Sequence, residues 1–300
     1  MQPKNLHAPL FGHLAVLVTI TIWATTYVFT KALLLHLTPS QILVIRSLLG
    51  LAVLTLIAPG KLVYVTRLDR LFVALAGFCG IFLYYFLENT ALLHTSATNV
   101  GVIVAAAPFT TLLASRIFLK DEKLRLSYFI GLALSMSGII ILTVPEGTGL
   151  AVSPLGDLLA VAAICVWALY TTLTRIIGRH GYPNLAVTRT MFFWGLVGHV
   201  IVLVAGGQTI PLATIAQTEI LLPLLFLGLV ASAFCFVLWN YALRSIGPVA
   251  SSFYLYLSPI ITIVVATTFL GEPFTALDGV GTALTLSGLV VSQWRFGAKK

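Results

Sequence analysis

Charged residues are scarce in this sequence. Only 9% of the 300 residues are charged and nine are acidic, whereas 59% are hydrophobic. A soluble domain carries roughly 25% charged residues, so this composition excludes a water-soluble fold, and the apolar excess must face lipid. The net charge of +8 would suit nucleic acid, but the placement of the basic residues along the chain indicates membrane topology and no nucleic-acid partner.

Cysteine and enzyme motifs are also sparse. The three cysteines, Cys79, Cys165 and Cys235, all lie in apolar runs and form neither a metal-ligand spacing nor a disulfide framework. The sequence contains no H-E-x-x-H, G-x-S-x-G, P-loop or G-x-G-x-x-G motif. It therefore predicts no metal site, no cofactor and no enzyme, and it argues against a membrane hydrolase or an ATP-driven pump.

Long apolar segments make up most of the chain. A bilayer core of about 30 Å needs about 20 apolar residues in a helix, and strands would need an alternation that is absent. The sequence therefore predicts an all-α integral membrane protein with ten transmembrane helices. The predicted spans are 11–35, 39–58, 71–93, 97–119, 126–144, 155–177, 185–205, 220–243, 249–270 and 274–294. Four prolines mark helix starts or breaks: Pro39, Pro154, Pro183 and Pro248.

Lysine and arginine alternate from one side of these spans to the other. With the N-terminus in the cytoplasm, 13 of the 17 basic residues fall in cytoplasmic segments, none in outer loops and the remaining four within helices. Such a bias follows the positive-inside rule. It predicts a multi-pass protein of the plasma (inner) membrane, with both termini cytoplasmic.

The two halves of the chain repeat one pattern. Residues 86–138 match residues 237–288: the Pro lies 19 positions after the Asn in both copies, and the matched Glu and Gly residues lie 150 apart. Since each half has five predicted helices, an odd number, the second copy must be inverted in the membrane, as in many secondary transporters. We therefore predict two inverted five-helix repeats, 11–144 and 154–294. The matched pairs are Asn89 and Asn240, Pro108 and Pro259, Glu122 and Glu272, Gly131 and Gly281, and Gly138 and Gly288.

At these residues the chain resembles the EamA-type transporters of the drug/metabolite transporter superfamily, over 12–144 and 154–292. The family's marks are a Trp in the first helix of each repeat, N-x-A-L ending the third, a Pro within the fourth and a Glu after it. Both halves carry them: Trp23 and Trp167, Asn89–Leu92 and Asn240–Leu243, Pro108 and Pro259, Glu122 and Glu272. Ala24 and Ala168 stand where the family usually has Gly. The resemblance implies a ten-helix carrier with alternating access, often an exporter of amino acids or other small metabolites.

Aromatic and hydroxyl side chains gather around two tryptophans. Trp23 and Trp167 lie near the midpoints of the first and sixth spans, whereas membrane tryptophan prefers the interface. Their repetition favours a cavity wall for a flat or aromatic solute, and ordinary helix packing is the alternative. The predicted substrate-binding residues are Trp23, Thr26, Tyr27, Thr30, Tyr84, Tyr85, Glu88, Asn89, Trp167, Tyr170, Trp239, Asn240 and Tyr254.

Three ionisable residues fall in the outer third of the predicted membrane: Lys31, Arg46 and Glu88. Such groups are costly there and usually pair or line a water-filled cavity. One interpretation is a charged network that binds a carboxylate or couples transport to protons through Glu88. The alternative is a static ion pair, with Lys31 reaching the interface. Arg189, near the cytoplasmic end of its span, is best explained in the same way.

Proline and glycine add two further expectations. Pro108 and Pro259 lie near the centres of their spans, where each removes a backbone hydrogen bond, so each is predicted to be a hinge or a static kink. The repeated glycines of the fifth and tenth spans allow close helix contact, within one chain or between the protomers of a homo-oligomer.

These observations favour a secondary transporter, in particular an exporter, of a small metabolite such as an amino acid or another amphipathic solute. A membrane receptor or sensor is the first alternative, but the predicted cytoplasmic loops are too short to hold a signalling domain. An intramembrane enzyme is the second, and it would need a reactive group at depth, where only Glu88 is available. The sequence names neither the substrate nor the coupling ion.

Overall fold

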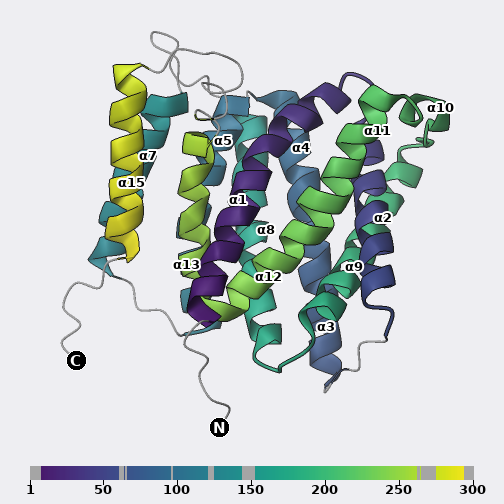
Figure 1. Cartoon of the computed structure of the whole chain (residues 1–300), viewed down its shortest axis with the longest axis horizontal. Helices are drawn as coiled ribbons and strands as arrows, with labels where there is room; N and C mark the ends of the chain where they lie inside the picture. The colour runs from purple at the N-terminus through teal and green to yellow at the C-terminus, as the bar shows by residue number, and fades with distance from the viewer. Residues whose placement is uncertain are drawn as a thin grey trace.

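A computed structural model describes residues 8–60, 64, 66–95, 97–120, 125–143, 153–261, 264 and 275–293. All regular elements in these ranges are helical, and they stand side by side in one bundle (Figure 1). The first half contains α1 (Ala8–Leu33), α2 (Pro39–Ile57), α3 (Arg67–Gly77), η1 (Phe78–Leu83), α4 (Tyr84–His94), α5 (Ala97–Ala105), α6 (Ala107–Phe118) and α7 (Leu126–Thr143).

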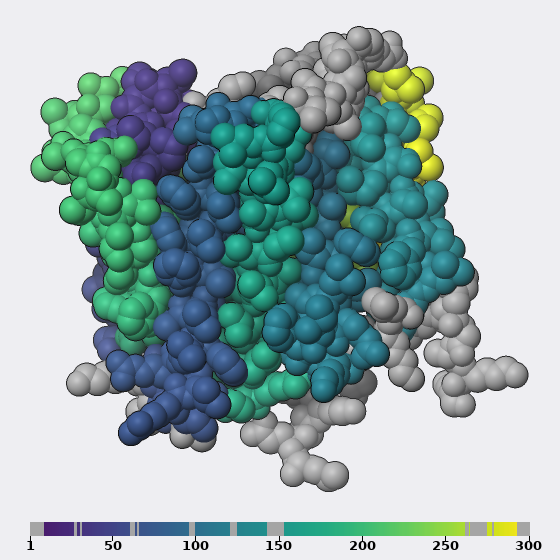
Figure 2. Space-filling model, turned by 180° about the vertical axis from the view of Figure 1, so that it is seen from behind, coloured from purple at the N-terminus to yellow at the C-terminus, as the bar shows by residue number. Residues whose placement is uncertain are grey.

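The second half continues the same pattern. It contains α8 (Pro154–Gly178), α9 (Asn184–Ala205), α10 (Leu212–Ile215), α11 (Thr218–Leu225), η2 (Phe226–Phe234), α12 (Cys235–Ser245), α13 (Pro248–Phe253), η3 (Tyr254–Tyr256) and α15 (Ala276–Gln293). Helices of the two halves interleave, since α1 packs on α12, α2 on α9 and α4 on α8. The view from behind shows first-half α3 and α4, in blue, beside second-half α8, in teal (Figure 2).

Seven helices in the described ranges are long and apolar enough to cross a membrane, so the chain is a multi-pass membrane protein. They are Pro9–Thr26, Pro39–Ile57, Arg67–His94, Val100–Phe118, Pro154–Gly178, Asn184–Ala205 and Thr218–Ser245. Three shorter apolar helices fall on the predicted fifth, ninth and tenth spans: Leu126–Leu142, Pro248–Ile261 and Gly279–Ser292. Each of these three predicted spans extends into residues outside the described ranges. The prediction of ten spans is therefore confirmed for seven and stays a prediction for three.

Helix starts follow the sequence signals. Pro39, Pro154 and Pro248 each occupy the first turn of a helix, where the missing N–H removes no intrahelical bond. Thr38 caps α2, because its hydroxyl accepts from Gln41 N while the Gln41 side chain accepts from Thr38 N. These local contacts fix where the spans begin.

The fourth span is broken at its proline. α5 ends at Ala105, and α6 begins at Ala107 with Pro108 in its first turn. In the second half, the three-residue turn η3 precedes the helical residues that contain Pro259. Both interruptions agree with the predicted kinks, and the hinge role of the two prolines stays a prediction.

Two π-helical stretches interrupt the third and eighth spans. η1 lies between α3 and α4, and η2 lies between α11 and α12. Shifting η1 by 151 residues, the spacing between Asn89 and Asn240, places it at 229–234, inside η2. Because π-helical turns are rare and often mark functional sites, their repetition in both halves directs attention to the side chains just after them.

The helices α7 and α15 pack against each other through their glycines, at one edge of the bundle (Figure 1). A Cβ added to Gly131 would lie 2.6 Å from the carbonyl oxygen of Gly288, and one added to Gly138 would lie 2.5 Å from that of Gly281. The earlier residue of α7 meets the later residue of α15, so the two helices are antiparallel. The predicted close contact of small residues is thus made within one chain. Glu122 and Glu272 lie outside the described residues.

Candidate functional site

Three tryptophans from three helices meet in the interior. Trp23 of α1, Trp167 of α8 and Trp239 of α12 have ring centroids 5.6, 5.3 and 5.4 Å apart, within the range of favourable aromatic pairs. Trp167 is 4% exposed and Trp239 is fully buried. Trp23 lies ten residues before the end of α1, about 15 Å along its axis, or half of a 30 Å core. The predicted tryptophans therefore come together at mid-depth.

Further rings surround this tryptophan trio. Phe236 packs 5.5 Å from Trp23, Tyr84 packs 4.8 Å from Trp167, and Tyr170 packs 5.0 Å from Trp167. Tyr170 fits because Gly80 in η1 leaves room for its ring: a Cβ on that glycine would lie 2.3 Å from the ring. The trio and its neighbours thus form one aromatic cluster with contributions from α1, η1–α4, α8 and α12.

The indole N–H groups of the trio differ in their partners. Trp23 Nε1 donates to the carbonyl oxygen of Ala231 in η2 at 2.8 Å. Trp167 Nε1 and Trp239 Nε1 are buried and find no acceptor in the described part of the chain. An indole nitrogen can only donate, and a buried donor without an acceptor costs about 1–3 kcal/mol. Two buried donors of the cluster are therefore without an acceptor among the described residues.

Asn240, the Asn of the second N-x-A-L, links three helices. Tyr170 Oη donates to Asn240 Oδ1 at 2.5 Å, and Asn240 Nδ2 donates to Thr188 Oγ1 at 2.9 Å. All three residues are fully buried. Asn89, its counterpart in the first half, donates to Tyr85 O of its own helix at 2.8 Å. The repeated motif therefore has two different structural roles.

Arg46 reaches the cluster from α2. Its Nε donates to Ser232 Oγ at 3.0 Å, one Nη donates to Tyr85 Oη at 3.3 Å, and its guanidinium carbon lies 4.3 Å from the Tyr85 ring centroid. The side chain is 4% exposed. Among the residues that the structure describes, no carboxylate lies at ion-pair distance from this guanidinium. Arg46 is therefore a buried cation among neutral partners.

Glu88 lies one helical turn beyond Tyr84 on α4. Its Oε1 accepts from Tyr84 Oη at 2.7 Å, and the residue is 7% exposed. The structure records no ion pair between Glu88 and Arg46. The third member of the predicted charged network, Lys31, has its side chain outside the described residues. The side chain of Tyr27, a predicted substrate-binding residue, is also outside them. The network thus stays a prediction.

The other predicted residues lie in two places. Thr26 and Thr30 follow Trp23 on α1, and the Tyr254 hydroxyl lies near the start of α1. Thr26 donates to Trp23 O at 2.7 Å and is half-buried, as is Thr30. Tyr254 Oη lies 2.8 Å from His13 Nδ1, and His13 precedes Trp23 by ten residues, about 15 Å along the helix. The structure therefore does not bring the Tyr254 hydroxyl to the tryptophan trio.

A match to the EamA-like transporter family covers residues 10–144 and, a second time, residues 154–293. The chain belongs to the EamA-like transporter family. It is thus a member of the drug/metabolite transporter superfamily, a membrane transporter of a small-molecule substrate and not an enzyme.

Relatives of this EamA-like transporter are themselves described as transporters. An uncharacterized transporter of Archaeoglobus fulgidus is 26% identical over 286 residues, covering 93% of this chain and 96% of that protein. A probable terminal-alkyne amino-acid exporter of Streptantibioticus cattleyicolor is 31% identical over 231 residues, covering 76% and 74%. The uncharacterized inner membrane transporter YedA of Escherichia coli is 24% identical, covering 66% and 63%. A crystal structure with 20% identity shares the fold, with a TM-score of 0.78 over 95% of this chain and 96% of that chain.

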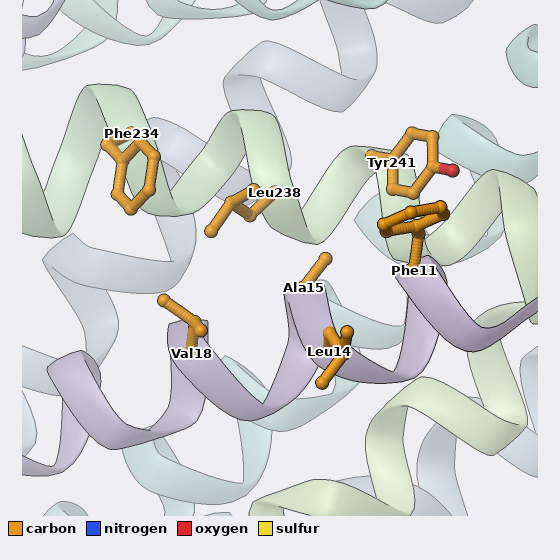
Figure 3. Close-up of a pocket in the computed structure, with 7 residues that line it drawn as sticks. All are labelled: Phe11, Leu14, Ala15, Val18, Phe234, Leu238 and Tyr241. Carbon is orange, nitrogen blue, oxygen red and sulfur yellow. The ribbon is translucent and has the colours of Figure 1, made fainter. Parts of the chain in front are cut away.

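A surface groove of this EamA-like transporter lies on α1 and the η2–α12 segment, apart from the aromatic cluster (Figure 3). Its volume is about 430 Å³, and most of its lining side chains are exposed on the outside of the bundle. The lining is almost entirely apolar: Phe11, Leu14, Ala15, Val18, Phe234, Leu238 and Tyr241. Solute sites combine an apolar wall with a few placed polar groups, and the lining of this groove does not have that composition.

Sequence reasoning missed three residues around the site. Phe236 contacts three rings of the cluster and the ring of Tyr85. Its position three residues before Trp239 places both on one helix face. Ser232 accepts from Arg46 across more than 180 residues of sequence. His199 is 2% exposed, with Nδ1 3.0 Å from Ser47 Oγ. For the last two, a single sequence carries no sign of the contact.

Proposed function

We propose that this protein is a secondary carrier that exports a small amphipathic solute, an amino acid or a similar metabolite, across the plasma membrane by alternating access. The observation that carries the proposal is the aromatic cluster, which combines a buried apolar wall at mid-depth with two indole donors that find no acceptor among the described residues. Secondary transporters bind their substrates near the bilayer midplane, between repeats. The cluster has this depth and draws on both halves of the chain.

The proposal includes an inverted relation between the halves, 11–144 and 154–294. Its support is the glycine contact between α7 and α15. Replacing Gly131 and Gly288 by their counterparts 150 residues away gives Gly281 and Gly138, and that pair is also in contact. When two copies are related by a two-fold axis in the membrane plane, each contact between them is expected to occur again between the counterpart residues. The proposal also places both termini in the cytoplasm, which the distribution of basic residues supports, and the protein in the plasma membrane, which the inner-membrane relative supports.

The solute class draws on chemistry and on one relative. Flat rings and neutral donors suit a small molecule with an apolar body and a hydrogen-bond acceptor. The relative named a probable terminal-alkyne amino-acid exporter supports an amino acid as the solute. Proton coupling through Glu88 is part of the proposal, because an ionisable group at this depth is a natural proton carrier.

The test removes the two indole donors and keeps the rings. Trp167→Phe and Trp239→Phe variants are reconstituted in proteoliposomes, and transport of radiolabelled phenylalanine, tryptophan and leucine is measured. We expect apparent KM to rise about tenfold, the equivalent of one lost buried hydrogen bond. Trp194→Phe is the matched control, since Trp194 on α9 packs edge-to-face on Phe193 outside the cluster. Unchanged KM in both cluster variants would show that the cluster is packing, and no transport by the wild type would refute the amino-acid assignment.

A further inference from the structure

We propose that Arg46 binds a carboxylate of the transported solute, which makes the substrate class a small carboxylate with an apolar body, such as an apolar α-amino acid. This inference rests on the proposed transport function and names the chemistry of its substrate.

The groups around Arg46 could accommodate an anion. Its two recorded partners, Ser232 and Tyr85, are hydroxyl groups, and a guanidinium carries more donors than these two bonds use. A buried cation is costly unless it is paired with an anion. The planar, permanently charged guanidinium also matches a carboxylate with two parallel hydrogen bonds. A solute carboxylate would supply the missing charge.

The acids of the chain do not take this place. Glu88 accepts from Tyr84 and forms no ion pair with Arg46. Asp69 pairs with His180 and accepts from Tyr182 near the start of α3. Of the other acids with described side chains, Asp157 caps the start of α8, and Glu219 is exposed in the first turn of α11. In the described ranges, no protein carboxylate therefore neutralises Arg46.

Arg46 and the tryptophan trio lie on either side of two rings. The guanidinium stacks on Tyr85, the Tyr85 ring lies 6.2 Å from Phe236, and Phe236 lies 5.5 Å from Trp23. A solute whose carboxylate meets Arg46 would lay its body along Phe236 toward the trio. One ring, Tyr85, lies between the guanidinium and Phe236, which fits a carboxylate attached close to an apolar side chain, as in an α-amino acid.

Arg189 is an arginine whose hydrogen-bond acceptors are supplied by the protein itself. Arg189 is the counterpart of Arg46 in the second half, one residue from the spacing of 144 that relates Trp23 to Trp167. It donates to the carbonyl oxygens of Ala58 and Gly60 at the end of α2, where the helix dipole favours a cation. Arg46 has hydroxyl partners in place of such carbonyls.

The experiment varies the solute and the residue together. Proteoliposomes containing wild type, Arg46→Gln, Arg46→Lys or Arg189→Gln take up labelled phenylalanine, 3-phenylpropionate, phenylalanine amide or phenethylamine, with protein-free liposomes as the leak control. Wild type should prefer the two carboxylates over the amide and the amine by at least about 30-fold, the loss typical of removing one partner of a buried charge pair. Arg46→Gln should bring this preference close to one, and Arg46→Lys should keep part of it.

The ratio of acid to amide uptake is internal to each variant, so it does not depend on expression. Arg189→Gln should keep the wild-type ratio. Thermal melting in detergent checks that each variant is folded. If Arg46→Gln does not fold, a full wild-type ratio in Arg46→Lys or in Ser232→Ala counts against the inference. Equal uptake of acids and amides by wild type, or a ratio that survives Arg46→Gln, would overturn the role of Arg46 and leave the carrier function standing. No uptake of any probe by wild type would overturn the proposed amino-acid function, and this inference with it.

Discussion

Replacing Asn240 with leucine should remove the polar link between α8, α9 and α12. The substitution deletes the acceptor of Tyr170 Oη, at 2.5 Å, and the donor to Thr188 Oγ1, at 2.9 Å. Thr188 keeps its bond to Asn184 O, whereas the fully buried Tyr170 hydroxyl loses its recorded acceptor. Since an orphaned buried donor costs about 1–3 kcal/mol and a second lost bond about 1 kcal/mol, the free energy of unfolding should fall by about 2–4 kcal/mol.

The chain supplies its own control in Asn89→Leu. Asn89 holds the same place in the first N-x-A-L, but its side chain donates to Tyr85 O within its own helix. One such bond is worth about 0.5–1.5 kcal/mol. Equal losses in the two variants would contradict the assignment of different roles to the two motifs.

A double-mutant cycle isolates the contact itself. Tyr170→Phe, Asn240→Leu and the double variant are unfolded reversibly in mixed micelles, and the free energies of unfolding are compared. We expect the double variant to be more stable than the sum of the single effects by about 1–2 kcal/mol, because the orphaned hydroxyl is gone. Additivity within about 0.5 kcal/mol would refute the reasoning.

Two further predictions concern topology and coupling. Single cysteines beside Glu122 and beside Glu272, in a protein with its own cysteines replaced, should react with an impermeant thiol reagent from opposite sides of the membrane; labelling from one side would contradict the inverted repeats. Glu88→Gln should leave solute binding measurable and abolish accumulation driven by a proton gradient, because an amide carries no exchangeable acid proton; full recovery when Lys31→Gln is added would assign a structural role to the charge.

Much of the fold follows from apolar length and repetition. Runs of about 20 apolar residues place the spans, and the prolines at 39, 154 and 248 mark starts that the structure confirms. The repeat singled out Trp23 and Trp167, and the structure brings them within 5.6 Å of each other. Tryptophan at mid-depth was informative because its usual place is the interface.

The orientation of side chains around each helix axis was beyond the sequence. Depth in the membrane suggested that Arg46 and Glu88 are neighbours, but depth does not say which way a side chain faces, and the two form no ion pair. Tyr254 was predicted on its aromatic character, yet its hydroxyl meets His13. The π-helical stretches have no composition that distinguishes them from ordinary helix, and they set the facing of the residues that follow.

Because of the π-helical stretch η1, the facing of the residues that follow it depends on how many residues the helix contains. Tyr84 N bonds to Cys79 O, five residues back, where an α-helix would use the residue four back. A deletion of one residue within Phe78–Leu83 could be absorbed by a return to the α-helical bond, whereas the same residues all wound as α-helix would turn everything beyond them by about 100°. Tyr85 would leave the guanidinium of Arg46 and Tyr84 would leave Trp167, although every residue that touches them would still be present. The geometry of the candidate site thus depends partly on the number of residues in a helix, which a comparison of side chains alone would not detect.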